Sequence, residues 1–185
     1  MQERGLQTSG LDVTPHLLAA AKARDLDGTY DEGSAEALPF DDASYHGTVF
    51  YLTLIDIPDM RRAIAEAARV MRPGAPMLIA NLTPHVTARP RNWVGEGSHW
   101  IFDEDGTAKY IAIDDMQVER ANVVSWKGIR MVNYHRPLSA YMTALLDAGM
   151  VLERFEDPPF TGPDEETKDK FTRVPWAFMM VWRKS

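Results

Sequence analysis

The residue types that most often carry reaction chemistry are sparse in this chain. It has no cysteine, which excludes a disulfide scaffold, a zinc ribbon, an iron–sulfur site and a thiol nucleophile. It has five histidines, and His99 and His135 are the two that could serve as a general base for a hydroxyl or carboxyl group. A packed or solvated histidine is the preferred interpretation for both, and His16 is predicted to lie on a helix surface. We therefore assign no catalytic base and no metal ligand.

The charge balance excludes several classes of partner. With 20 basic and 27 acidic side chains the formal charge is −7, and no basic stripe is present to neutralise the phosphates of nucleic acid or of an anionic membrane. The longest apolar runs, residues 49–55 and 177–182, are too short to span a bilayer. No basic segment followed by an apolar one opens the chain. We expect a soluble, cytoplasmic protein without a nucleic-acid or membrane partner.

Asp12 is a carboxylate at a predicted junction between a strand and a helix. The stretch before it is apolar and favours a strand that ends near Asp12. Thr14 is a suitable N-cap and Pro15 a suitable first helical residue, so a helix is predicted from Pro15 to about Arg24. Two interpretations of Asp12 stay open: its carboxylate contacts a ligand, or it is solvated.

The next segments predict a parallel sheet. Residues 47–55 are apolar at odd and even positions, which is typical of a strand buried on both faces. Asp59 can cap a helix that runs to Met71, and the next short buried strand is residues 77–80. The apolar positions of that helix recur three to four residues apart, at Met60, Ile64, Ala67 and Met71. This alternation indicates an α/β doubly wound sheet.

The middle of the chain, from residue 85 to 133, has a different pattern. Asp105 and Gly106 lie between two short apolar runs and predict a hairpin. Residues 123–132 alternate well enough for one further strand. Because the segment is too long for a connector, we expect a lid or cap. Its aromatic residues could line a substrate cavity or form the small core of the insert: Trp93, Trp100, Phe102 and Tyr110.

The C-terminal segment returns to regular patterns. A helix is predicted from about Leu138 to Ala148, with Gly149 as the residue that closes it. Residues 151–155 and 176–182 are predicted as a final pair of strands around a charged loop, residues 163–170. No low-complexity segment divides the 185 residues, and 45% hydrophobic content suffices for one core. We therefore expect one domain.

Five segments, in order and spacing, resemble the class I S-adenosylmethionine-dependent methyltransferases, in particular the small-molecule group called type 11. They are Gly10-Leu-Asp-Val-Thr-Pro15, the stretch from Gly33 to Tyr45, Ile57-Pro-Asp59, Ala68-Arg-Val-Met-Arg-Pro-Gly74 and the stretch from Asn133 to Gly149. The resemblance implies a Rossmann-like sheet with helices on both faces and a lid-like insert. It divides the chain into a cofactor-binding α/β core over residues 1–84, a lid over the acceptor pocket at 85–133, and a C-terminal helix and strand pair at 134–185.

The resemblance also implies which residues bind S-adenosylmethionine. Carboxylate oxygens at the end of the first predicted strand match the family's ribose ligand, as in dinucleotide folds. The family most often has aspartate where this chain has Ser34, which weakens or reassigns the contact to adenine. For Tyr51, packing in the core is as good an interpretation as a ligand contact. The implied set is Asp12 and Val13 at the ribose, Ser34, Ala35 and Glu36 at the adenine, and Tyr51 and Leu52 at the methionine moiety.

One departure from the family is the absence of a glycine-rich turn. In the family this turn precedes the ribose carboxylate by about twenty residues. Asp12 is too near residue 1 to follow such a turn, and Gly95 and Gly97 lie in the insert with no helix after them. We expect a sheet that is incomplete at its N-terminus and lacks its central strand. Truncation is the preferred explanation; completion by a partner, such as a second copy in a homodimer, and a non-catalytic remnant are the alternatives.

The predicted function is methyl transfer from S-adenosylmethionine to a small molecule. The alternative is a methyltransferase-like protein without catalysis that binds a partner through its exposed sheet edges. A nicotinamide-dependent enzyme would also need a ribose carboxylate, but the strand pair after Val151 and the absence of a second nucleotide-binding half argue against it. The acceptor atom and the substrate are not determined by the sequence.

Overall fold

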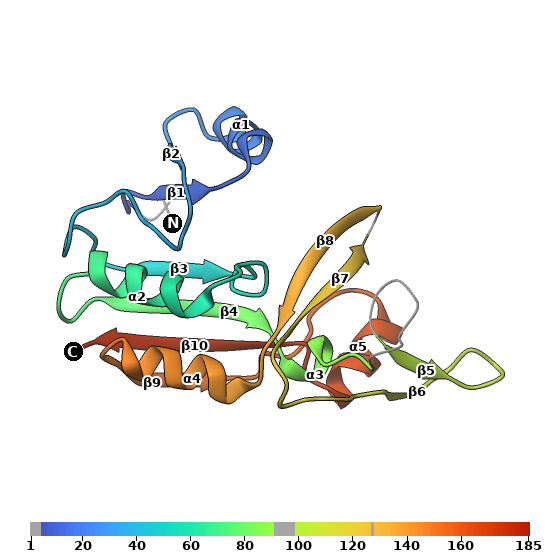
Figure 1. Ribbon diagram of the computed structural model, residues 1–185. Coiled ribbons are helices and arrows are strands. Elements are labelled where there is room, and N and C mark those ends of the chain that lie inside the picture. The colour runs from blue at the N-terminus through green and yellow to red at the C-terminus, as the bar shows by residue number, and fades with distance from the viewer. Residues whose placement is uncertain (1–4, 91–98, 127) are drawn as a thin grey trace.

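Two parallel strands and the helix between them form the N-terminal part of the molecule (Figure 1). The computed structural model describes residues 5–90, 99–126 and 128–185. Strand β1 (Ser9–Asp12) pairs in parallel with β2 (Thr29–Glu32), and helix α1 (Pro15–Arg24) connects them. The predicted strand end at Asp12 and the predicted helix are confirmed. Thr14 holds the N-cap position, but its side chain makes no capping hydrogen bond.

A second sheet has four strands in the order β3-β4-β10-β9. Strand β3 (Thr48–Tyr51) pairs in parallel with β4 (Pro76–Leu82). Strand β10 (Ala177–Lys184) runs antiparallel to β4 and to β9 (Met150–Glu156). The predicted C-terminal strand pair is therefore confirmed, and it extends the parallel pair into a mixed sheet.

Helices α2 (Met60–Val70) and α4 (Leu138–Asp147) pack with one face of this sheet to form the main core. Asp59 caps α2 by accepting a hydrogen bond from the backbone N–H of Arg62 at 3.0 Å, and Gly149 follows α4 with a φ of +74°. Both predicted helix boundaries are confirmed. The four apolar positions predicted for the core face of α2 and its end are each no more than 2% exposed: Met60, Ile64, Ala67 and Met71.

The opposite face of the four-stranded sheet carries exposed apolar side chains. Val49, Leu78 and Met179 are exposed, whereas Phe50 on the other face of β3 is buried. The prediction that β3 is buried on both faces is wrong, because α2 and α4 cover only the face that Phe50 shares with the core. The predicted strand is also too long: it ends at Tyr51, since Leu52 adopts a φ of +53°.

The middle segment contains two hairpins and one short helix, α3 (Pro84–Thr87). The predicted hairpin around Gly106 is confirmed as β5 (Trp100–Phe102) and β6 (Ala108–Ile111). The single strand predicted over residues 123–132 is wrong. The chain turns at Gly128, whose φ is +79°, and forms the antiparallel pair β7 (Arg120–Trp126) and β8 (Ile129–His135).

The charged segment that was predicted to be a loop contains helix α5 (Glu165–Arg173), so that prediction is wrong. The side chain of Asp164 caps it by accepting from the backbone N–H of Thr167 at 3.0 Å, and acidic residues occupy its first turn and basic residues its last. This order suits the helix dipole and compensates for the lack of a buried face. No helix in the described part of the chain is long and apolar enough to cross a membrane.

Candidate functional site

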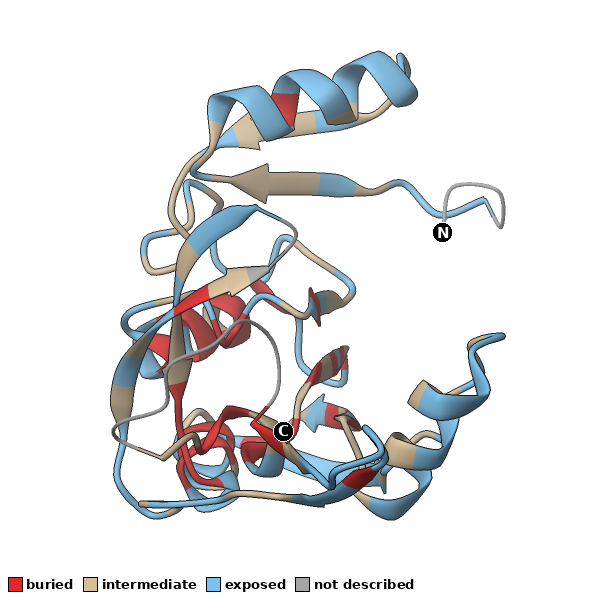
Figure 2. Cartoon of the chain, turned by 90° about the vertical axis from the view of Figure 1, so that its right-hand side faces the viewer, coloured by how far each residue is buried: buried red, intermediate tan, exposed pale blue. Residues whose placement is uncertain are grey.

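Strands β1 and β3 lie in two separate sheets, of two and four strands, and the chain extends these sheets in opposite directions (Figure 1). From β1 the chain goes through α1 to β2, and from β3 it goes through α2 to β4, each time into a parallel neighbour. Figures 1 and 2 show β1 on the side of its pair that is nearer the rest of the molecule, and in Figure 1 the arrows of β1 and β3 point the same way. Ligands of open α/β sheets bind outside the carboxyl ends of strands at such a switch point.

Asp12 lies at the carboxyl end of β1, at this switch point. Its Oδ1 accepts a hydrogen bond from the backbone N–H of Thr14 at 2.8 Å, and its carbonyl accepts from the N–H of Gly33 at 3.1 Å. Its Oδ2 makes no hydrogen bond to any residue in the described ranges. The next residue, Val13, is 65% exposed. A half-buried carboxylate with one oxygen engaged and one available can accept hydrogen bonds from ligand hydroxyls.

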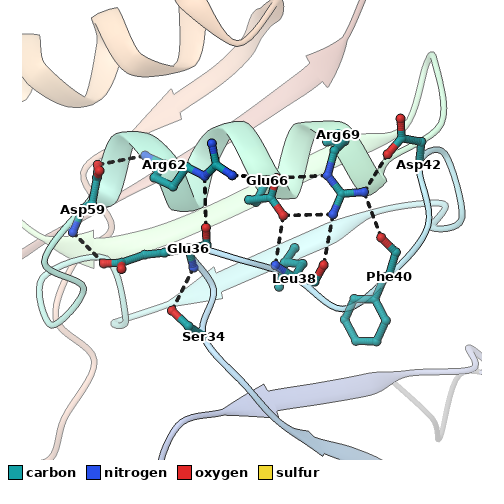
Figure 3. Close-up of polar contacts among 9 residues, drawn as sticks. All are labelled: Ser34, Glu36, Leu38, Phe40, Asp42, Asp59, Arg62, Glu66 and Arg69. Carbon is teal, nitrogen blue, oxygen red and sulfur yellow. Dashed lines mark hydrogen bonds and ion pairs between the residues drawn. The ribbon is translucent and has the colours of Figure 1, made fainter.

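The loop after β2 is folded back on itself and attached to α2 (Figure 3). The hydroxyl of Ser34 accepts from the N–H of Glu36 at 3.1 Å, which shapes the turn that contains Ala35. The carboxylate of Glu36 accepts from the N–H of Asp59 at 2.7 Å, and its carbonyl accepts from Nε of Arg62 at 3.1 Å. One Glu36 oxygen thus fixes the start of α2, so its side chain has a structural role besides any contact with a ligand.

An ion pair on α2, between the buried Glu66 and the part-exposed Arg69, holds the rest of this loop in place. Glu66 is 8% exposed; it accepts from the N–H of Leu38 at 2.9 Å and pairs with Arg69 at 2.9 Å. Arg69 also donates to the carbonyls of Leu38 and Phe40 and to the carboxylate of Asp42, as Figure 3 shows. The hydrogen bond from Arg69 lowers the pKa of Glu66. We call the loop of residues 33–44 the strap, and Asp42 is one of its anchors.

The end of β3 presents an aromatic ring and a turn. Tyr51 is 68% exposed, so packing in the core does not explain it in this structure. Leu52 is half-buried, and its N–H donates to the carbonyl of Ala80 on β4 at 2.7 Å. Its positive φ is costly for a non-glycine residue. The chain therefore leaves the sheet directly after Tyr51.

Arg136 is the residue near this site that the sequence interpretation missed. It is only 3% exposed, and it donates to the carbonyls of Leu54, Ile57 and Pro58 at 2.8, 2.7 and 2.8 Å. Its side chain thus binds the loop that follows β3. No local pattern in the sequence identifies the acceptors of Arg136, because they lie about eighty residues away.

The two candidate histidines are packed in the interior, as predicted. His135 donates from Nε2 to the carbonyl of Met116 at 3.0 Å, so its Nδ1 accepts from the hydroxyl of Thr87 at 2.8 Å. Burial lowers its pKa. Burial, followed by the charge of Arg89, lowers the pKa of His99 to about 4. Both rings are neutral near pH 7. Within the described residues, no group of three or more histidines and carboxylates could hold a metal ion.

A cavity of about 340 Å³ lies beyond the carboxyl end of β4. It is mostly apolar, with the polar side chains of His85, Ser139 and Asp157 among its walls. Trp93, one of the four aromatic residues predicted to line a cavity, lies outside the described residues. The other three are not in the wall of this cavity: Trp100 is buried beside Arg173, Phe102 contacts Lys170, and Tyr110 is exposed. Trp100 and Phe102 instead attach the β5–β6 hairpin to α5.

Comparison with known proteins supports the predicted family. Residues 1–79 match the family described as a methyltransferase domain. The demethylmenaquinone methyltransferase of Chlorobaculum tepidum is 31% identical over 98 residues, which are 53% of this chain and 38% of that protein. The chain thus spans about two fifths of the length of that curated relative. The predicted resemblance to type 11 methyltransferases is confirmed over the N-terminal segment.

Solved structures confirm the fold over the whole chain. A Listeria monocytogenes protein assigned to the S-adenosylmethionine-dependent methyltransferases superposes with a TM-score of 0.82 at 20% identity, over 100% of this chain and 83% of that one. A Mesorhizobium loti S-adenosylmethionine-dependent methyltransferase gives 0.77 at 23% identity, over 99% and 83%. The fold is therefore the Rossmann-like class I methyltransferase fold, as predicted.

Proposed function

We propose that this protein is an S-adenosylmethionine-dependent methyltransferase that acts on a small molecule. The observation that carries the proposal is the carboxylate of Asp12 at the carboxyl end of β1, with Oδ2 available and with the loop of Ser34 following the adjacent β2. The fold and the match of residues 1–79 support the same conclusion.

The available groups fit most of the proposed cosubstrate. Asp12 can accept from ribose hydroxyls. The polar turn at Ser34, Ala35 and Glu36 lies beyond the neighbouring strand, where adenine would follow the ribose. The exposed ring of Tyr51 can face a cationic sulfur and attract it modestly. The described residues contain no glycine-rich turn between a strand and a helix. We therefore assign none of them to bind the amino-acid end of the cosubstrate.

The bound cosubstrate would supply an electrophilic methyl group on a sulfonium. In the transfer, an acceptor lone pair forms a bond to the methyl carbon while the carbon–sulfur bond breaks and its electron pair stays on sulfur. A protic acceptor would release its proton to solvent, since no side chain among the described residues is assigned as a base. The chain's contribution is therefore to hold the acceptor atom in line with the methyl carbon and the sulfur.

Residues 85–133 are proposed as the lid over the acceptor. The cavity beyond β4 is lined in part by Met116 and Gln117 of this segment, and its apolar walls suit a small, partly apolar acceptor. The proposed location is the cytoplasm, in keeping with the net charge of −7 and with the lack of a spanning helix in the described residues. We also propose a homodimer that completes the exposed strand edges.

A second candidate is a binding protein without catalysis. Within the described residues, β1 pairs only with β2 and β3 only with β4, which leaves one edge of each strand unpaired. Unpaired edges are places where another chain can add a strand. A protein that uses these edges for a partner would not need the cosubstrate.

Calorimetric titration of the chain with S-adenosylhomocysteine separates the two candidates. We expect saturable heat for the unmodified chain and about tenfold weaker binding for Asp12→Asn, whose amide oxygen still accepts from Thr14. The matched control is Asp31→Asn on β2, which should bind within about twofold of the unmodified chain. Absence of heat at millimolar ligand would contradict the methyltransferase proposal and favour the binding protein.

A further inference from the structure

We propose that Arg136 is a positioning residue that sets the shape of the site loop, which we define as residues 52–58 after β3, and couples it to the β7–β8 hairpin. The inference rests on the proposed function, because the site loop continues directly from Tyr51 and Leu52. It adds a residue outside the predicted cofactor set.

The first step is the convergence of three carbonyls on one guanidinium. Leu54, Ile57 and Pro58 each direct a carbonyl oxygen at Arg136, at distances of 2.7 to 2.8 Å. The nearest carboxylate is that of Glu119, 3.9 Å from Nε. The buried guanidinium is thus bonded to three carbonyl dipoles of the loop, with Glu119, the ring of Tyr134 at 4.9 Å and the hydroxyl of Tyr141 as further neighbours. The planar fork of arginine can serve three acceptors at once, and a lysine ammonium cannot span them.

The second step is that both ends of the site loop lie at the candidate site. At its start, the N–H of Leu52 is bonded to Ala80 on β4. Directly after its end, the N–H of Asp59 donates to the carboxylate of Glu36 at 2.7 Å. A change in the shape of this loop would therefore move Leu52 and Glu36, both of which belong to the proposed cosubstrate site.

The third step is the connection to the hairpin. Tyr134 of β8 donates its N–H to the carbonyl of Ile55 at 2.6 Å, and the side-chain amide of Asn133 donates to the carboxylate of Asp56 at 2.5 Å. Arg136 follows the same strand. Asn133, Tyr134 and Arg136 thus bind five of the seven residues of the site loop, so the hairpin and the site loop form one unit.

The test uses Arg136→Lys in the full chain, with Arg120→Lys as matched control. Among the described residues, Arg120 also donates to backbone carbonyls alone, those of Asp114, Asp115 and Arg89, but these lie in the insert and not in the site loop. Both variants should lower the melting temperature. We expect Arg136→Lys to weaken the binding of S-adenosylhomocysteine about tenfold, and Arg120→Lys to weaken it less than about twofold.

Hydrogen exchange gives a readout that does not need ligand. In Arg136→Lys, peptides covering residues 52–58 should exchange faster relative to the other peptides, and in Arg120→Lys they should not. Asn133→Ala, which removes only the bond to Asp56, should raise exchange in the same peptides to a smaller degree and remains informative if Arg136→Lys does not fold.

The outcomes separate this inference from the proposed function. Selective exchange of the site loop together with selective loss of affinity supports the inference. Equal affinity in Arg136→Lys and the unmodified chain overturns it. If the unmodified chain binds no S-adenosylhomocysteine, the proposed function fails, while loop exchange in the variants still supports or overturns the control of loop shape by Arg136.

Discussion

Single side chains in this protein hold distant backbone segments in place, and Glu66 shows how. Its carboxylate is bound by Leu38, which lies 28 residues earlier, and by Arg69 one turn later on α2. These bonds fix the polar loop between β2 and β3, which has no secondary structure of its own over residues 33–44. Without them the loop that carries Ser34 and Glu36 would have few reasons to adopt one shape.

We predict that Glu66→Gln lowers the free energy of unfolding by about 1 to 3 kcal/mol. The substitution replaces the charge-assisted bonds between the buried Glu66 and Arg69 by neutral contacts. Urea denaturation measures the change. Glu165→Gln is the control, since its pair with Lys168 is exposed, and we expect less than about 0.5 kcal/mol there. A loss as small as the control's would mean that the strap contributes little to stability.

The residues of the site were predictable to different degrees. The sequence places Asp12 at the end of a strand, because the helix start at Thr14 and Pro15 follows it directly. It could not give the role of Glu36 at the start of α2 or of Arg136 in the site loop. These roles depend on contacts across 23 residues and about eighty residues, and no local pattern encodes them.

At the scale of elements, helix α2 links the core to the site. Its apolar face packs on the sheet, its first turn is fixed by Asp59, and its polar face binds the strap. We predict that Asp59→Ala lowers the free energy of unfolding by about 1 kcal/mol, the usual loss for an N-cap. Thermal unfolding would measure it.

The control for this cap is Thr14→Ala at the start of α1. Thr14 makes no side-chain capping hydrogen bond, so we expect a loss of less than about 0.5 kcal/mol. An equal loss of stability in Asp59→Ala and Thr14→Ala would show that the capping hydrogen bond of Asp59 does not stabilise the start of α2.

Helices α2 and α4 were predicted from their apolar spacing, and α1, in which only Leu18 is buried, was predicted from its start at Thr14 and Pro15. Helix α5 has no buried residue, and a charged surface helix resembles a loop in composition. The β7–β8 hairpin was taken as one strand because its turn at Gly128 interrupts an alternation that continues on both sides.

At the scale of the molecule, the buried histidines make stability depend on pH. The pKa of His99 is about 4 in the folded state, and an unfolded histidine titrates near about 6.5. Below that value the unfolded chain binds a proton that the folded chain excludes, so stability falls as the pH falls from about 6.5 toward 4. His135, with its lowered pKa, contributes in the same direction.

We therefore predict that the free energy of unfolding decreases by about 1 kcal/mol per pH unit or more between pH 6 and pH 4.5. Urea titrations at several pH values measure this slope. His99→Gln should flatten it, whereas His16→Gln on the exposed surface of α1 should leave it unchanged. An unchanged slope in His99→Gln would contradict the assignment of the effect to burial of this ring.

The fold of the whole molecule follows from the alternation of strands and helices, and it is confirmed over the full chain. What the sequence could not show is how unevenly the sheet is covered. Val49 and Leu78 sit in strands that look buried by composition, yet α2 and α4 lie on the other face. The composition of a strand gives its apolar content, but it does not show which face of the strand a helix covers.

The central claim is that the carboxyl ends of β1, β2 and β3 bind S-adenosylmethionine. The most direct test is photochemical crosslinking of isotope-labelled S-adenosylmethionine to the full chain, followed by mass spectrometry of the modified peptides. We predict label in peptides that contain Asp12 and Val13, Ser34 to Glu36, or Tyr51 and Leu52, and its loss when unlabelled S-adenosylhomocysteine competes. Label confined to other peptides, or label that does not respond to the competitor, would contradict the claim.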